Sequence, residues 1–168
     1  MQEKKKDSVP NPTQQQQVVI EKMEEFYSSH NRQGEYFLLS GFAGTGKTFS
    51  ISHFIRKIPK AKVALTAPTN KAVRVLEMMA STAGLSIETQ TIHSLLGLVV
   101  QQQQDSQVLK KKRESRLKDY SLIVLDECSM VNQELWQHIE NEINLSRTKI
   151  IFMGDSAQLP PVHEVVSP

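Results

Sequence analysis

A chain of 168 residues with a formal net charge of +2 is long enough for one domain with a buried core, and its charge does not by itself predict a nucleic-acid binder. The hydrophobic share of 39% and the charged share of 23% exclude a disordered tail, and a single cysteine excludes an intramolecular disulfide. No apolar run approaches the roughly 18 residues of a membrane span. We therefore expect a cytoplasmic protein, nuclear if the source is eukaryotic, with no membrane partner.

The chain begins with a polar, lysine-rich segment, residues 1–10, which predicts a disordered N-terminal arm before a single domain over 11–168. A helical pattern follows over 13–27. Thr13 and Gln16 fit a capping box, in which the hydroxyl covers one unpaired amide at the helix start and the glutamine covers another.

The most informative stretch is a glycine-rich turn between an apolar strand pattern over 36–40 and a helical pattern over 48–58. It fits the P-loop pattern G-x-x-x-x-G-K-[ST], and its residues are Gly41, Phe42, Ala43, Gly44, Thr45, Gly46, Lys47 and Thr48. A strand, a turn and a helix in this order aim backbone N–H groups and a helix N-terminus at one point, which favours polyphosphate. Lys47 would reach the β- and γ-phosphates, and the Thr48 hydroxyl would bind Mg²⁺. We expect the chain to bind a nucleoside triphosphate.

Strand and helix patterns alternate along the rest of the chain. Strand patterns cover 62–67, 121–125 and 149–153, and helical patterns cover 70–80 and 133–143. Such alternation predicts an α/β fold with a mostly parallel sheet, helices on both of its faces and right-handed crossovers. Loops that carry function should then gather at the carboxyl ends of the strands.

An inserted β-hairpin is expected over 98–112, because Asp105 and Ser106 form a turn signal between two runs of similar length. Lys110, Lys111 and Lys112 follow the second run. On charge alone, a solvated surface and a nucleic-acid contact are both open readings of these lysines.

Two acids, Asp126 and Glu127, end the apolar strand pattern over 121–125. A P-loop enzyme needs a carboxylate to hold Mg²⁺ and a second group to orient the attacking water. Asp126 at the strand end suits the metal, and Glu127 suits the water. A further strand pattern ends at Gly154, and the loop after it carries Gln158, an uncharged side chain that could sense the γ-phosphate.

Five blocks in this order resemble motifs I, Ia, Ib, II and III of superfamily 1 helicases: GFAGTGKT (41–48), APTNKAV (67–73), TIHSLL (91–96), DECSM (126–130) and GDSAQLPPV (154–162). The last two blocks resemble the RecD, TraA and phage Dda branch, whose members move 5′ to 3′. The resemblance covers roughly residues 11–163. It implies a RecA-like ATP-binding domain of a DNA helicase, with ATP and Mg²⁺ as cofactors.

The resemblance also implies a nucleotide-binding residue near the N-terminus. A glutamine there reads the adenine edge in this family. Gln16 is the candidate, with Gln15 and Gln17 as alternatives because the glutamine run blurs the register. The capping box would compete for the same side chain, or the two roles would coexist.

Contacts to single-stranded DNA, with RNA left open, are implied for two further blocks. Pro68, Thr69 and Asn70 open a helix that would hold a phosphate, and Thr91 and His93 form a second segment. For His93, packing beneath the DNA strand is an equal reading. The hairpin occupies the place of the insertion that separates DNA strands in this family, which favours a DNA role for its lysines.

A second RecA-like domain with an arginine finger completes the motor in this family, and 1–168 carries no motif for it. We therefore expect a partner domain, in the same polypeptide or another, and weak ATP hydrolysis without it. The alternative to a helicase motor is a non-motor module whose DNA binding depends on nucleotide. An unrelated P-loop kinase would need a lid with arginines and an acceptor pocket, and neither is apparent.

Overall fold

The computed structural model describes residues 10–30, 35–42, 44–103 and 106–155. Ala43, Gln158 and all of the expected arm except Pro10 lie outside these residues.

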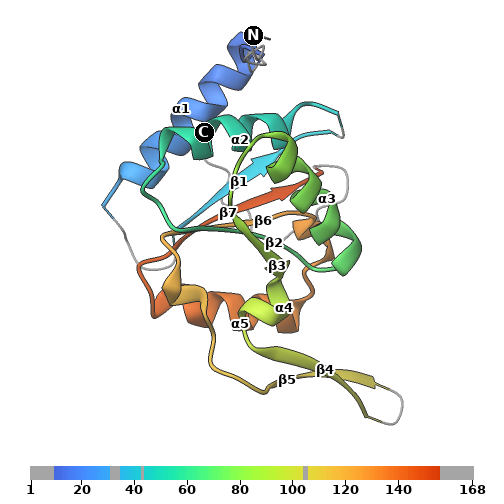
Figure 1. Ribbon diagram of the computed structural model, residues 1–168. Coiled ribbons are helices and arrows are strands. Elements are labelled where there is room, and N and C mark those ends of the chain that lie inside the picture. The colour runs from blue at the N-terminus through green and yellow to red at the C-terminus, as the bar shows by residue number, and fades with distance from the viewer. Residues whose placement is uncertain (1–9, 31–34, 43, 104–105, 156–168) are drawn as a thin grey trace, which may run out of the picture.

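Five parallel strands form the central sheet, in the order β1-β7-β6-β2-β3 (Figure 1). These are β1 (Tyr36–Ser40), β2 (Val63–Ala67), β3 (Glu88–Thr91), β6 (Leu122–Leu125) and β7 (Lys149–Gly154). The central strands read as continuous apolar runs because helices cover both of their faces. The expected parallel α/β sheet is confirmed.

Helices cover the two faces of this sheet, as expected (Figure 1). On one side lie α1 (Gln14–Ser28), α2 (Lys47–Lys57) and α3 (Asn70–Thr82). On the other lie α4 (Ile92–Leu95) and α5 (Gln133–Asn144), together with the short 3₁₀ helices η1 (Leu117–Asp119) and η2 (Cys128–Met130). Among the described residues, no helix has both the length and the apolar character needed to cross a bilayer.

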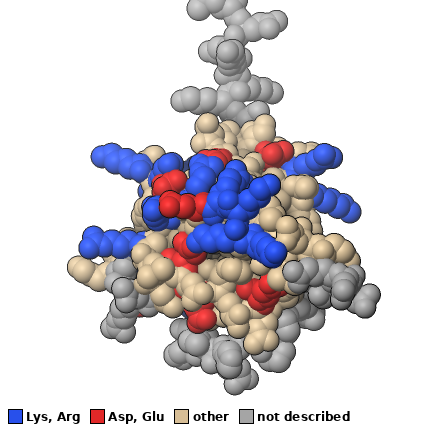
Figure 2. Space-filling view, turned by 90° about the horizontal axis from the view of Figure 1, so that it is seen from below, with Lys and Arg blue, Asp and Glu red and all other residues tan. Residues whose placement is uncertain are grey.

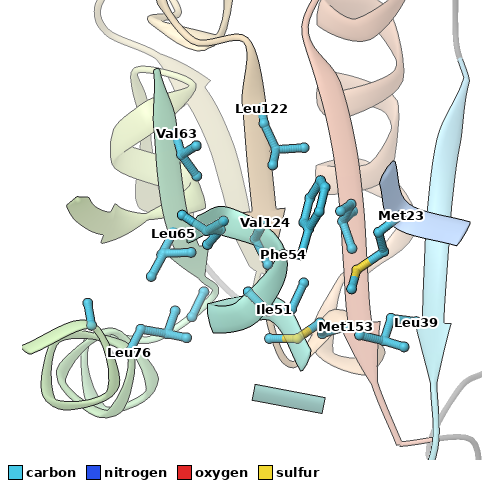
Figure 3. Packing of buried hydrophobic residues seen from close by; sticks show 14 of the residues in the cluster. Met23, Leu39, Ile51, Phe54, Val63, Leu65, Leu76, Leu122, Val124 and Met153 are labelled. Atoms are coloured by element: carbon cyan, nitrogen blue, oxygen red, sulfur yellow. The ribbon is translucent and has the colours of Figure 1, made fainter. Parts of the chain in front are cut away.

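The sheet separates two hydrophobic cores. The first lies under α1, α2 and α3, where Ile51 and Phe54 of α2 are fully buried against Leu65 and Val124 of the sheet (Figure 3). The second packs Ile139 and its neighbours on α5 against the opposite face. Each such side chain contributes about 1.5–3 kcal/mol by leaving water, so these cores fix the strand ends that carry the functional loops.

The first helix is held at both of its ends. At its start the predicted capping box is present: Thr13 Oγ1 accepts from the Gln16 N–H at 3.3 Å, and Gln16 Oε1 accepts from the Thr13 N–H at 2.9 Å. At its end the ammonium of the buried Lys149 donates to the carbonyl oxygens of Phe26 and Ser29, the latter at 2.8 Å. Burial lowers the pKa of Lys149, and these bonds stabilise its charge.

The expected hairpin is formed by β4 (Leu98–Gln103) and β5 (Ser106–Lys111), which pair antiparallel and project beyond α5 (Figure 1). Gly97 closes its base, because the Gly97 carbonyl accepts from the N–H groups of Lys112 at 2.8 Å and Arg113 at 3.2 Å. Gly97 has φ 69°, and a Cβ there would overlap the Arg113 carbonyl. Only glycine fits this turn without strain.

Two elements around Thr91 were not expected from the sequence. Glu88–Thr91 pairs with β2 as an edge strand, and the next four residues form α4. The strand is short and polar, so it has neither the alternation nor the apolar run that indicates a strand.

Candidate nucleotide and nucleic-acid site

The carboxyl ends of the five strands form one edge of the domain, and the order of strands divides that edge into two halves. The P-loop follows β1, Asp155 follows β7, and Asp126 follows β6. Pro68 follows β2, and α4 follows β3. The nucleotide candidates therefore lie along one half of the edge, and the DNA candidates lie along the other.

The P-loop turns with two glycines in the left-handed region, Gly44 at φ 81° and Gly46 at φ 80°. Gly46 caps α2 without a side-chain hydrogen bond. No side chain therefore caps the N-terminus of α2 or accepts from the N–H groups of its first turn. A helix N-terminus of this kind binds phosphate oxygens.

Lys47 folds back over this loop. Its Nζ lies 2.5 Å from the Gly41 carbonyl oxygen and 3.0 Å from that of Phe42. The ammonium is thus held above the turn by neutral acceptors. A phosphate oxygen carries more negative charge than these carbonyls and would bind the ammonium more strongly.

Asp126 is fixed from two directions. Its N–H donates to the Thr66 carbonyl at 2.9 Å, and its Oδ1 accepts from the Glu127 N–H at 2.8 Å. Burial raises the pKa of the Asp126 carboxyl, while that hydrogen bond and the positive charge of Lys47 act in the opposite direction. The charge of Lys47 thus acts on Asp126, and the strand order places the loops after β1 and β6 on the same edge of the sheet, with β7 between them.

Glu127 has an unusual backbone. Among the described residues it is the non-glycine residue with a positive φ, at φ 52° and ψ 40°. A non-glycine residue in this region typically costs about 1–3 kcal/mol and is held there by its surroundings. The conformation turns the chain directly after Asp126, and the Glu127 side chain is exposed at the strand edge.

Gln16 reaches the P-loop as well as capping its own helix. A Cβ added to Gly46 would overlap the Gln16 amide nitrogen, so this side chain lies against the loop. Gln17 instead donates to Glu21 at 2.9 Å along the surface of α1, and Gln15 is exposed. Of the three alternatives, Gln16 is the one whose side chain lies against the P-loop, and it forms the capping box at the same time.

The first two groups of DNA candidates lie at the neighbouring ends of β2 and β3, where Ala67 is in register with Thr91. Thr69 caps α3 by accepting from the Ala72 N–H at 3.2 Å, and Thr91 caps α4 by accepting from the Ser94 N–H at 3.1 Å. Asn70 is exposed in the first turn of α3. Two helix starts thus meet at adjacent strand ends.

His93 joins these two segments. Its ring donates a hydrogen bond to the Pro68 carbonyl, and burial lowers the pKa of the imidazole. This contact favours the interpretation of His93 as a packing residue, because it supports the loop that precedes α3.

The hairpin lysines differ from one another. Lys110 and Lys112 are exposed, whereas Lys111 donates to Glu142 of α5 at 2.8 Å. Figure 2 shows Lys and Arg atoms gathered on the face seen from below, with Asp and Glu atoms among them. Part of the positive charge on this side is therefore neutralised within the chain.

One positioning residue was missed from the sequence. Thr66 is fully buried in β2, its hydroxyl donates to the Val124 carbonyl at 2.9 Å, and its carbonyl accepts from Asp126. A polar side chain inside an apolar strand was the available signal. Cys128 packs against the second core, and burial together with the Asp126 charge raises its pKa to about 11.

A family model described as an AAA domain matches residues 27–164. The chain belongs to this family. Within it, the chain is a RecA-like domain of the superfamily 1 helicase type, and the resemblance noted from the five sequence blocks is confirmed.

The chain is similar to three longer proteins. An uncharacterised protein of Acanthamoeba polyphaga mimivirus, R530, is 41% identical over 90% of this chain and 34% of its own length. ATP-dependent DNA helicase Pif1 of Bdellovibrio bacteriovorus is 29% identical over 78% of this chain and 30% of its own. The solved structure of a Bacteroides Pif1 helicase in complex with ADP-AlF3 and ssDNA has the same fold, with a TM-score of 0.58 and 24% identity over 93% of this chain and 35% of that one. The chain thus spans about a third of the length of these relatives.

Proposed function

We propose that this chain is the ATP-binding motor domain of an ATP-dependent DNA helicase that moves 5′ to 3′ on single-stranded DNA. The observation that carries the proposal is the convergence of Lys47 and Asp126 at the strand edge, beside the helix starts at Thr69 and Thr91. One edge then offers a polyphosphate site at the ends of β1 and β6 and, at the ends of the next strands β2 and β3, a site for a sugar-phosphate backbone. Similarity to Pif1 helicases supports the same assignment.

In the proposed ATP site, Lys47 and the first turn of α2 bind the phosphates, and Gln16 lies where it could meet the base. Glu127 accepts a proton from the attacking water and orients it. Gln158, outside the described residues, is assigned to sensing the γ-phosphate.

The donor set at this edge fits Mg²⁺. No group of three or more metal-binding side chains occurs among the residues that the structure describes. Mg²⁺ usually binds through one or two protein oxygens together with water and substrate phosphates, and Thr48 and Asp126 offer one hydroxyl and one carboxylate. The ion would neutralise negative charge on the phosphates as the terminal phosphoryl group is transferred.

In the proposed DNA track, Pro68, Thr69 and Asn70 bind one backbone phosphate at the start of α3. Thr91 binds on the neighbouring strand end, and His93 supports Pro68 from below. Hydrogen bonds from helix N-termini to phosphates carry no sequence information, which suits a motor that must move over any sequence. Lys110 and Lys112 add charge along the hairpin.

A second RecA-like domain, in the same polypeptide or another, is the proposed partner. An arginine finger typically supplies about 10³–10⁵ in turnover, so Glu127 alone cannot make the reaction fast. We expect the 168-residue chain to bind Mg-ATP and to hydrolyse it slowly.

The test is binding and turnover of ATP with and without single-stranded DNA, for the chain alone and supplied with a second RecA-like domain. Lys47→Ala should weaken binding of Mg-ATP at least tenfold, because it removes the side chain that bridges the phosphates. Lys60→Ala, which removes an exposed lysine on the connection after α2, is the matched control and should bind normally.

Turnover stimulated by DNA only when the second domain is present, and abolished by Lys47→Ala, supports the motor. DNA binding that depends on nucleotide without turnover in either form would indicate the non-motor module instead. Equal binding of Mg-ATP by Lys47→Ala and the wild type would overturn the proposal.

A further inference from the structure

The hairpin is attached to the domain along one of its edges. Strand β5 pairs with β4 on one side only, so its other side presents backbone groups that the hairpin itself does not use. One of them, the Leu109 N–H, donates to Glu134 Oε1 of α5 at 2.9 Å. A carboxylate thus replaces a neighbouring strand at this edge.

A second contact lies further along the same two elements. Lys111 Nζ donates to Glu142 Oε1 at 2.8 Å, and Lys111 and Glu142 follow Leu109 and Glu134 on β5 and α5. The Lys111 side chain is 51% exposed, and an ion pair as exposed as this contributes little. The bond to Glu134 is partly buried and holds the backbone of β5 rather than the end of an exposed side chain, so it is the one that can fix the strand.

Packing keeps these contacts in register. Leu98 and Leu109 are on opposite strands, and both pack against the second hydrophobic core, which includes Leu135 beside Glu134. The base is fixed at Gly97. Val100, which is opposite Leu109 in the register, is 53% exposed, so β4 at this level has less support from the domain than Leu98 at the base has.

These contacts tie the hairpin to a particular helix. The chain runs from the end of β6, where Asp126 and Glu127 lie, through η2 directly into α5. Glu134 is in the first turn of α5. The hairpin is therefore held by the element that follows the acidic pair of the ATP site.

We propose that Glu134 is a positioning residue that fixes the direction of the hairpin by holding the Leu109 N–H, so that the hairpin meets the junction between duplex and single strand. This inference rests on the proposed helicase function. The inference extends that function by assigning the orientation of the hairpin to one carboxylate on α5.

The test compares Glu134→Ala, Glu134→Gln and Glu140→Ala. The glutamine keeps an oxygen that can accept from Leu109, and Glu140 is an exposed glutamate of the same helix with the same charge. The first readout is hydrogen exchange of the Leu109 amide. The second is affinity for a forked DNA against its single-stranded arm alone, measured in the presence of a non-hydrolysable ATP analogue.

We expect Glu134→Ala to accelerate exchange at Leu109 by about tenfold or more, because a charge-assisted hydrogen bond is lost. The same variant should lose about three- to tenfold in affinity for the fork and keep its affinity for the single strand and for nucleotide. Glu134→Gln should restore most of the protection at Leu109 and most of the affinity for the fork. Glu140→Ala should behave as the wild type.

Two results would overturn the positioning role alone, provided that the wild type binds DNA. One is unchanged exchange at Leu109 in Glu134→Ala, and the other is a preference of Glu134→Ala for the fork equal to that of the wild type. Absence of DNA binding by the wild type would overturn the proposed function, and the junction role with it. Retained nucleotide affinity in Glu134→Ala shows that the variant is folded, so a lost fork preference is then a local effect.

Discussion

The amide of Gln16 lies against Gly46, so the first turn of α1 touches the turn that begins α2. Gln16 is held there by the capping box, in which its Oε1 accepts from the Thr13 N–H. The side chain therefore reaches the P-loop with its oxygen already committed and its nitrogen at the loop. A cap at the start of one helix sets the position of a group at the start of another.

This contact makes the two left-handed glycines of the P-loop unequal. Gly44→Ala meets nothing within 4 Å and carries only the cost of a positive φ, about 1–2 kcal/mol. Gly46→Ala carries that cost and also displaces the Gln16 amide. We expect Gly46→Ala to unfold at a lower denaturant concentration than Gly44→Ala. Adding Gln16→Ala to each variant should reduce the difference between their unfolding midpoints. A difference that persists in the double variants would show that Gln16 is not its cause.

Asp126 should be kept for function at some cost in stability. Its pKa is raised by burial, so the protonated form favours the fold, and that contribution is lost as the pH rises through the folded pKa. Asp126→Asn keeps an acceptor for the Glu127 N–H without the buried charge. We expect its melting temperature at pH 7.5 to rise by about 2–4 °C, the change that about 1 kcal/mol produces in a domain of this size.

The same substitution should abolish binding of ATP that depends on Mg²⁺, and calorimetry without nucleotide separates the two effects. A lower melting temperature for Asp126→Asn would show that the carboxylate is satisfied in the fold. The gain should shrink at low pH, where the wild-type carboxyl is protonated.

Glu127→Gln should separate hydrolysis from binding. The glutamine has almost the same shape and can occupy the same backbone conformation, but it cannot take a proton from water. We expect turnover, measured with the second domain present, to fall by about 10²–10⁴. Affinity for Mg-ATP should stay within about threefold, because Lys47 and Asp126 are intact. A variant that retains full turnover would remove Glu127 from the chemistry.

Most of the fold could be predicted because its main elements are long and apolar. The helix pattern over 133–143 corresponds to Gln133–Asn144, and the strand pattern over 149–153 corresponds to Lys149–Gly154. The edge strand Glu88–Thr91 could not be predicted, since its residues are polar and its place depends on pairing with β2. Local sequence carries no signal for a strand that exists only through its neighbour.

The site could be predicted in part for a similar reason. Lys47 was predicted from the spacing of the P-loop pattern, and Asp126 from its place at the end of an apolar strand. Parallel topology then places both strand ends on one edge of the sheet. The Thr66 hydroxyl donates to the Val124 carbonyl, and the Glu134 carboxylate accepts from the Leu109 amide, so both side chains act on the backbone of another segment. Contacts of this kind depend on how distant segments pack against each other, which cannot be predicted from a single sequence.

His93 gives the domain a pH dependence that can be tested on stability alone. Burial lowers the pKa of the folded imidazole below its ordinary value of 6.5, so above that value the ring is neutral in both the folded and the unfolded chain. As the pH falls below 6.5 the unfolded chain takes up a proton first, and stability is lost until the folded ring is protonated too.

His93→Asn keeps an N–H donor for the Pro68 carbonyl and does not titrate. We expect the free energy of unfolding of the wild type to fall more steeply than that of His93→Asn between pH 7.5 and about pH 5.5, measured by denaturant titration at each pH. The two curves should run parallel above pH 7, where neither side chain at this position is charged. If they stay parallel throughout, the wild-type ring binds its proton equally well in the folded and unfolded states, and burial does not disfavour its charged form.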